Sequence, residues 1–171
     1  MSPPDNPHAA TSQDDPADEQ RFREISAALV AAVAEVVPAW IERLVIERVR
    51  SWSGEVSADV EQAATTAGVE AAADVVPRMQ ALVETDLDHQ RTNPLSLLRD
   101  TTRFAHEVLV DVGVPTVARD PFVQRSFPDD DYGLVPASWD EVDPSLHELG
   151  LTWGAAKAFL FKARRRAEGK T

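Results

Sequence analysis

The sequence contains no cysteine among its 171 residues. Without thiols the chain cannot form a disulfide scaffold, use a thiol nucleophile, or ligate zinc or an iron–sulfur cluster through cysteine. A cytoplasmic location is compatible with this composition, and we expect one. Because 43% of the residues are hydrophobic and 27% are charged, the chain has enough apolar surface to fold around a core without disulfides or metals.

The sequence also lacks a long uninterrupted apolar run. The longest apolar stretch, residues 27–41, contains Glu35 and Pro38 and is shorter than the roughly 20 residues that cross a bilayer. The first residues are polar and acidic, whereas a signal peptide is basic and then apolar. We therefore expect a soluble protein without a membrane partner. Residues 1–18 should form a disordered acidic leader, and residues 19–171 a single helical domain.

Motifs of the common enzyme classes are missing as well. The chain contains no phosphate-binding loop ending in lysine, no glycine-rich dinucleotide turn and no nucleophile elbow of the GxSxG type. Asp86 and His89 form one carboxylate–histidine pair, but a di-metal site in a helical bundle needs two. Arg103 occupies the position that would complete the second pair with His106. We therefore predict no metal site, no cofactor and no catalytic residues, and an enzyme is the less favoured class.

Positive charge is scarce and unevenly placed along the chain. The formal net charge of −12 disfavours broad attraction to nucleic acids or anionic membranes. Residues 1–20 carry five acidic and no basic side chains, whereas residues 143–171 carry six basic and three acidic ones. We expect the acidic leader to fold back on the basic end and screen it. Arginine outnumbers lysine 14 to 3, a bias that favours a bacterial origin.

Apolar spacing predicts helices in the first half of the chain. Between residues 18 and 52, large apolar side chains recur every three or four residues, which is the period of a helix with a buried face. Pro38 predicts either a kink or the start of a second helix. Gly54 is a suitable stop, and Ser57 is a suitable cap for another helix that runs to about residue 76. Val-Val-Pro occurs in both segments, which indicates two kinked helices that face one another.

The second half is predicted to contain two further helices separated by an irregular arm. Asn93 as the cap, Pro94 at the first helical position and Gly113 beyond the end delimit one helix, of which one face is formed by Leu95, Leu98, Thr102, Ala105 and Leu109. Prolines limit residues 113–144 to an irregular Pro-rich arm with short helices such as 121–127, and the acidic run PDDDYG should be a solvated turn. Thr152 caps a C-terminal helix over residues 152–168.

These elements predict the fold class. We expect an all-α protein, an irregular helical bundle of long Pro-kinked helices, completed by the Pro-rich arm and the C-terminal helix.

One polar cluster is a candidate ligand site. Asp100, Arg103, His106 and Glu107 lie at helical spacings of three and four residues. Such spacing is typical of ordinary ion pairs on a helix surface, which is the favoured interpretation. If the cluster lines a pocket instead, Arg103, His106 and Glu107 are the candidates for ligand contact in a small-molecule-binding protein or an enzyme.

Near the end of the chain, ELGLTWGAAKAFLFKARRR at residues 148–166 resembles the DNA-binding helix-turn-helix of sigma factors and related regulators. The residues that match are Glu148, Leu149, Gly150, Leu151, Thr152, Gly154, Lys157, Leu160, Ala163 and Arg164 to Arg166. The resemblance implies a helix-turn-helix over residues 144–166, with Gly150 as a left-handed turn residue and Thr152 as the cap of the recognition helix. Trp153, Ala155 and Lys157 would then approach DNA, and Arg164, Arg165 and Arg166 would hold phosphates.

The same segment has a second interpretation, which we favour. Phe159 and Phe161 stand where the family has polar or basic residues, and a helix that is apolar on most sides is normally buried. We therefore expect a buried last helix with a basic tail. The favoured function is a noncatalytic module that binds a protein partner, regulates it, or associates with itself. DNA-binding transcriptional regulation is the first alternative, and small-molecule binding or catalysis at residues 100–107 is the second.

Overall fold

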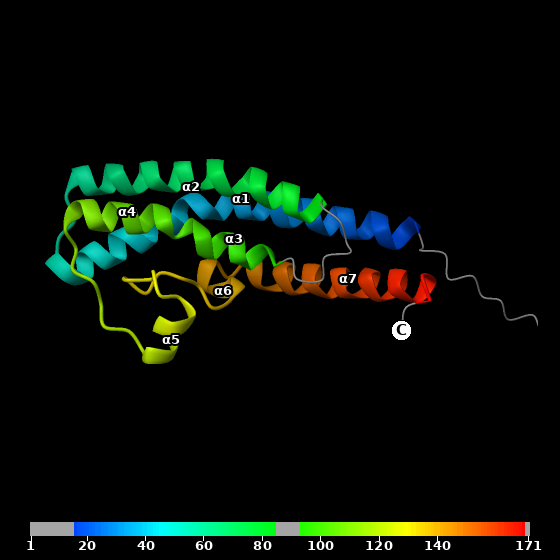
Figure 1. Ribbon diagram of the computed structural model, residues 1–171. Coiled ribbons are helices and arrows are strands. Elements are labelled where there is room, and N and C mark those ends of the chain that lie inside the picture. Colours follow the sequence, from blue (N-terminus) through cyan, green and yellow to red (C-terminus); the bar gives the residue numbers. More distant parts are fainter. Residues whose placement is uncertain (1–15, 85–92, 170–171) are drawn as a thin grey trace, which may run out of the picture.

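The computed structural model describes residues 16–84 and 93–169, and every regular element in these two ranges is a helix. The helices are α1 (Pro16–Ser53), α2 (Ala58–Glu84), α3 (Pro94–Thr101), α4 (Arg103–Val112), α5 (Pro121–Ser126), α6 (Trp139–Val142) and α7 (Leu146–Ala167). The predicted all-α helical bundle is therefore confirmed (Figure 1). None of the described helices is both long enough and apolar enough to pass through a membrane.

The two longest helices, α1 and α2, form an antiparallel pair that is the centre of the bundle (Figure 1). Ser57 caps α2 as predicted, since its hydroxyl accepts a hydrogen bond from the N–H of Val60 at 3.4 Å. α2 continues to Glu84, beyond the predicted end near residue 76. The buried residues of these two helices are mainly valine and alanine, and the aromatic side chains Phe22 and Trp40 of α1 are buried as well.

Pro38 lies inside α1 and Pro77 lies inside α2, and both helices continue past these prolines. Pro38 cannot donate a hydrogen bond to the carbonyl of Ala34, and Pro77 cannot donate one to that of Ala73. Ala34 and Ala73 are exposed, so water can satisfy these carbonyl groups. Neither proline therefore ends its helix, and the alternative that Pro38 begins a second helix is wrong.

Helices α3 and α4 follow the sequence signals closely. The side chain of Asn93 accepts a hydrogen bond from the N–H of Leu95, and Gly113 ends α4 in the left-handed conformation with φ 82°. The single helix predicted here is divided at Thr102, whose hydroxyl donates to the carbonyl of Arg99 at 2.7 Å. The predicted inward face is confirmed, because all five of its members are buried: Leu95, Leu98, Thr102, Ala105 and Leu109.

The arm between residues 113 and 144 is irregular, with α5 and α6 as short helices, and this confirms the prediction. The acidic run within it is not a purely solvated turn, however. Asp130 is only 6% exposed, and its carboxylate accepts hydrogen bonds from the N–H groups of Leu134 and Val135 at 2.6 and 3.2 Å. The prediction was wrong at this residue because a buried carboxylate can hold a turn together through backbone donors.

The last helix differs most from its prediction. α7 begins at Leu146 and contains no turn at Gly150, whose backbone is helical. Thr152 is not a cap, since its hydroxyl donates to the carbonyl of Glu148 within the same helix at 2.7 Å. Gly150 is required for packing, because a Cβ there would overlap the ring of Trp139. The helix predicted over residues 152–168 therefore starts earlier, and the helix-turn-helix predicted over residues 144–166 is not formed.

α7 lies alongside α1 and runs in the opposite direction, so that its last turns are beside the first turns of α1 (Figure 1). α1 begins at Pro16, so residues 16–18 of the predicted leader are helical. Residues 1–15 lie outside the described part of the chain.

Candidate functional site

The candidate site lies along α7, on a helix that is firmly attached to α1. Trp153 is 4% exposed, and its indole N–H donates a hydrogen bond to the hydroxyl of Ser26 at 3.0 Å. The ring also packs against Phe22, with 5.8 Å between the ring centroids. Leu160 is buried on the same side of the helix. These contacts fix the orientation of α7 and determine which face it leaves open.

The open face of α7 forms one side of a groove with a volume of about 860 Å³. Trp139 from α6 and Pro94 from the start of α3 contribute to its lining, together with Trp153, Leu151 and Phe161 of α7. Gly154 lies at the groove, and a Cβ added there would meet no atom within 4 Å. The groove is therefore lined by residues of α3 and of the consecutive helices α6 and α7. Trp139 and Trp153 are buried, so its accessible apolar side chains are mainly Leu151 and Phe161.

Basic side chains surround this apolar surface. Lys157, Lys162, Arg165 and Arg166 all line the groove, and none of its described lining residues is acidic. Lys162, Arg165 and Arg166 are exposed, and the guanidinium of Arg165 lies 5.8 Å from the centroid of the Phe161 ring. The groove thus combines aromatic surface with local positive charge on a chain whose net charge is −12.

Lys157 differs from the other three cations because it is only 8% exposed. Its ammonium lies 5.4 Å from the centroid of the Trp153 ring, within the range of a cation–π contact. Burial lowers the pKa of Lys157 from its ordinary value, since the charged form loses hydration.

Arg164 points to the other side of α7 and does not line the groove. Its guanidinium forms an ion pair with Glu19 of α1 at 3.0 Å, and both side chains are 29% exposed. The acidic start of α1 therefore meets the basic end of α7. This contact is consistent with the expected attraction between the two ends of the chain, although it involves α1 and not the leader itself.

The residues predicted to contact DNA are divided by the fold. Trp153 is buried and hydrogen-bonded to Ser26, so the prediction that its side chain projects toward DNA is wrong. The favoured expectation of a buried last helix with a basic tail is contradicted at Phe159, which is 59% exposed, and Phe161 is only half-buried. The reason is that α7 packs on one side only, where Trp153, Lys157 and Leu160 are buried.

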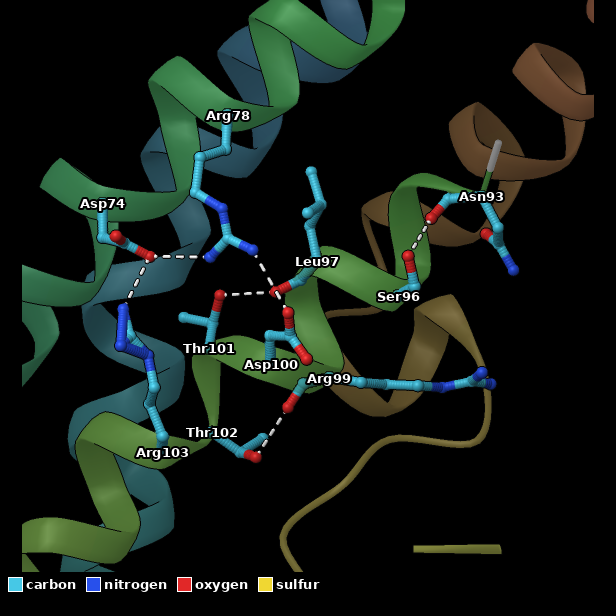
Figure 2. A network of polar contacts seen from close by, with 10 residues as sticks. All are labelled: Asp74, Arg78, Asn93, Ser96, Leu97, Arg99, Asp100, Thr101, Thr102 and Arg103. Carbon is cyan, nitrogen blue, oxygen red and sulfur yellow. Dashed lines mark hydrogen bonds and ion pairs between the residues drawn. The ribbon is translucent and has the colours of Figure 1, made fainter. Parts of the chain in front are cut away.

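The polar cluster at residues 100–107 takes part in an ion-pair network (Figure 2). Asp74 of α2 accepts contacts from Arg78 and Arg103, both at 3.0 Å, and Arg78 also pairs with Asp100 at 3.1 Å. The hydrogen bond from Arg78 lowers the pKa of Asp74 most, and Arg103 lowers it further. The network joins α2 to α3 and α4, which is the ordinary structural role that we favoured.

The three predicted ligand contacts are not brought into one pocket. Arg103 and His106 border a polar groove of about 860 Å³ beneath the arm, but Glu107 is exposed and is not among its described lining residues. His106 makes an edge contact with the ring of Tyr132, with 5.2 Å between centroids. The groove also contains both acidic and basic side chains that already pair with one another, among them Arg78 and Asp100.

Metal ligation has little support in the described ranges, which contain no group of three or more side chains suited to hold an ion. Asp86 and His89, the pair that we considered in the sequence, lie outside the described residues.

Sequence reasoning missed the residues that other elements contribute to the α7 groove. Trp139 and Pro94 were not singled out, because nothing local indicates that the start of α3 and the short helix α6 meet at α7. Four tryptophans in a chain with 6% aromatic residues were the available signal. Comparison of the chain with family models, with curated proteins and with solved structures found no match.

Proposed function

We propose that this protein is a noncatalytic partner-binding module, and that the α7 groove binds an acidic, amphipathic segment of a partner protein. The observation that carries the proposal is that one groove combines the accessible apolar side chains Leu151 and Phe161 with the exposed cations Lys162, Arg165 and Arg166, while none of its described lining residues is acidic. The rest of the chain is acidic overall, so this local composition is specific to the groove. The cytoplasm is the proposed setting.

The chemistry of the groove favours such a segment for two reasons. Aromatic and arginine side chains supply much of the binding energy in protein interfaces, where apolar anchors enter pockets and a polar rim surrounds them. An amphipathic helix presents its apolar residues on one stripe and its carboxylates beside it. Its apolar stripe would contact Leu151 and Phe161, and its carboxylates would face Lys162, Arg165 and Arg166.

An acidic peptide fits better than a nucleic acid. Binding of nucleic acids requires an extended positive surface that contacts several phosphates, and the net charge of −12 opposes it over most of this chain. The helix-turn-helix implied by the sequence resemblance would require a turn at Gly150, which α7 lacks. Regulation of transcription through DNA contact remains the alternative function that the experiment below separates from peptide binding.

The indole N–H signals of the four tryptophans provide a direct test. Trp139 and Trp153 line the groove, whereas Trp40 and Trp52 do not, so each protein sample contains two reporters and two internal controls. α7 rises about 24 Å between Gly150 and Arg166 at 1.5 Å per residue, so a helical probe of about 16 residues matches its length. One probe peptide carries leucine and phenylalanine on one face and glutamate elsewhere, and the second carries lysine in place of every glutamate.

We expect the glutamate peptide to shift the Trp139 and Trp153 signals and the lysine peptide to shift none. Gly154→Leu should block binding, because it fills the groove at a position with open space, while Gly154→Ala should bind normally. The proposal is wrong if the glutamate peptide shifts no indole signal, or if it shifts them equally in Gly154→Leu. Shifts caused by a DNA duplex or an RNA strand and by neither peptide would favour the nucleic-acid alternative.

A further inference from the structure

The chain itself contains an acidic segment that directly precedes α1, the helix whose first turn contacts the end of α7. Residues 1–15 contain three aspartates, Asp5, Asp14 and Asp15, and no lysine or arginine. The same segment contains three prolines, at positions 3, 4 and 7. These 15 residues precede α1 directly, since α1 starts at Pro16. The segment therefore has carboxylates at the end closest to the bundle and prolines farther away.

The packing of α1 on α7 places the start of α1, which follows this segment, beside the end of α7. Glu19, in the first turn of α1, lies 3.0 Å from Arg164 in the last turn of α7. The groove cations Lys162, Arg165 and Arg166 occupy the same last turns of α7. In the sequence, Asp14 and Asp15 precede Glu19 by five and four residues, and Glu19 contacts the turns of α7 that carry these cations.

The segment is also long enough to reach the far end of the groove. An extended chain spans about 3.3 Å per residue, so 15 residues can cover about 50 Å. The distance along α7 from Arg166 back to Gly150 is about half of that, at 1.5 Å per residue.

We propose that residues 1–15 occupy the α7 groove within the same molecule and compete there with the acidic segment of the partner. Asp14 and Asp15 would pair with Arg165 and Arg166, and the prolines would lie on the accessible apolar side chains Leu151 and Phe161. Proline-rich segments bind aromatic-lined grooves readily because they lose little conformational entropy on binding. This inference rests on the proposed function, since it assigns a competitor and hence a regulation to the same groove.

Covalent attachment makes a weak contact effective. A short flexible tether holds its attached segment at an effective concentration in the millimolar range, so even a segment with low intrinsic affinity occupies its site for much of the time. A partner peptide must displace it, and its apparent affinity falls in proportion to the fraction of open grooves. For a groove that is closed about four-fifths to nine-tenths of the time, the apparent affinity is about five to ten times weaker.

The test compares two variants of the full chain that have the same net charge. In the first, Asp5, Asp14 and Asp15 are changed to asparagine, which removes the charge of the segment. In the second, Glu47→Gln, Glu107→Gln and Asp111→Asn remove the same charge from exposed positions away from the groove. We expect the first variant to bind the glutamate peptide about five to ten times more tightly than the original chain, and the second to bind as the original does.

A second readout does not depend on any peptide. Because the chain has no cysteine, Ser2→Cys provides a unique site for a nitroxide spin label. We expect the label to broaden the indole signals of Trp139 and Trp153 more than that of Trp52, and Arg165→Glu with Arg166→Glu to abolish this difference.

The two proposals fail in different ways. If the peptide binds equally to the original chain and to both variants, and the label broadens no groove signal selectively, the segment does not occupy the groove although the groove binds peptides. If no form of the chain binds the peptide while the label still broadens Trp139 and Trp153, the segment occupies the groove and the proposed partner chemistry is wrong. Equal tightening in both variants would also overturn the competition, because it would reflect net charge alone.

Discussion

The indole N–H of Trp153 donates a hydrogen bond to the hydroxyl of Ser26 at 3.0 Å, across the contact between α7 and α1. Both side chains are buried, at 4% and 5% exposure. This pair joins residues that are 127 positions apart in the sequence, and it fixes the ring that forms part of the groove. The groove therefore depends on a polar contact inside the core as well as on its own surface residues.

Removal of this hydrogen bond should weaken the whole fold. Ser26→Ala leaves the Trp153 N–H without its acceptor in a buried position, so we expect the free energy of unfolding to fall by about 1–3 kcal/mol. Ser126→Ala is the matched control, because Ser126 is exposed and its hydroxyl donates only to the carbonyl of Phe122. Urea denaturation monitored by circular dichroism measures both. Equal stability of the two variants would contradict the importance of the Ser26–Trp153 contact.

Two helical glycines should respond in opposite ways to the same substitution. A Cβ at Gly68 would overlap the carbonyl oxygen of Pro38, whereas a Cβ at Gly154 would meet no atom within 4 Å. We expect Gly68→Ala to destabilise the protein by about 1–3 kcal/mol, because it separates α1 from α2. Gly154→Ala should stabilise it by about 0.5–1 kcal/mol through higher helix propensity. Thermal unfolding of both variants measures these changes in stability. A more stable Gly68→Ala protein would show that α1 and α2 are not in close contact at this position.

The ion-pair network at Asp74 predicts a specific dependence of stability on pH. Its hydrogen bond with Arg78, supported by Arg103, lowers the pKa of Asp74 below its ordinary value of 3.8. The contribution of the network to stability is therefore complete above about pH 5 and is lost as the pH falls through the pKa of the folded state. Since the arginines are 40% and 48% exposed, we expect Asp74→Asn to cost only about 0.5–1 kcal/mol at pH 7.

The difference between the original chain and Asp74→Asn should shrink as the pH falls below 3.8, because Asp74 then becomes protonated in the folded state as well. Chemical denaturation at a series of pH values measures this difference, with the exposed Asp111→Asn as the control for removal of one negative charge. A difference that stays constant over the whole acidic range would mean that the network does not stabilise the folded state through the charge of Asp74.

Local signals in the sequence were sufficient for most helices. Asn93 with Pro94, Gly113 and Ser57 fix helix ends through contacts within a few residues, and the structure has all three ends where they were predicted. The inward face of α3 and α4 was also predictable from local sequence, since the period of a helix determines which side chains lie on the same side.

The roles of residues that depend on contacts with distant parts of the chain could not be predicted in this way. Gly150 was interpreted as a turn residue because glycine often ends helices, but its small size serves the close approach of Trp139 from α6. Asp130 was placed in solvent because three consecutive aspartates are normally exposed, but its carboxylate caps the backbone of the arm. The lining of the groove combines residues of α3, α6 and α7, and it depends on packing that no single segment encodes.

The central claim is that the cations at the end of α7 select an acidic partner segment, and a charge exchange tests it most directly. Arg165→Glu with Arg166→Glu reverses the charge at one end of the groove while its aromatic surface stays in place. Isothermal titration calorimetry measures the binding of each peptide to the original chain and to this double variant. We expect the glutamate peptide to bind the double variant about tenfold or more weakly than the original chain, and the lysine peptide to bind the double variant more tightly. If the glutamate peptide binds the original chain and this double variant equally well, charge at the groove does not select the partner and the account is contradicted.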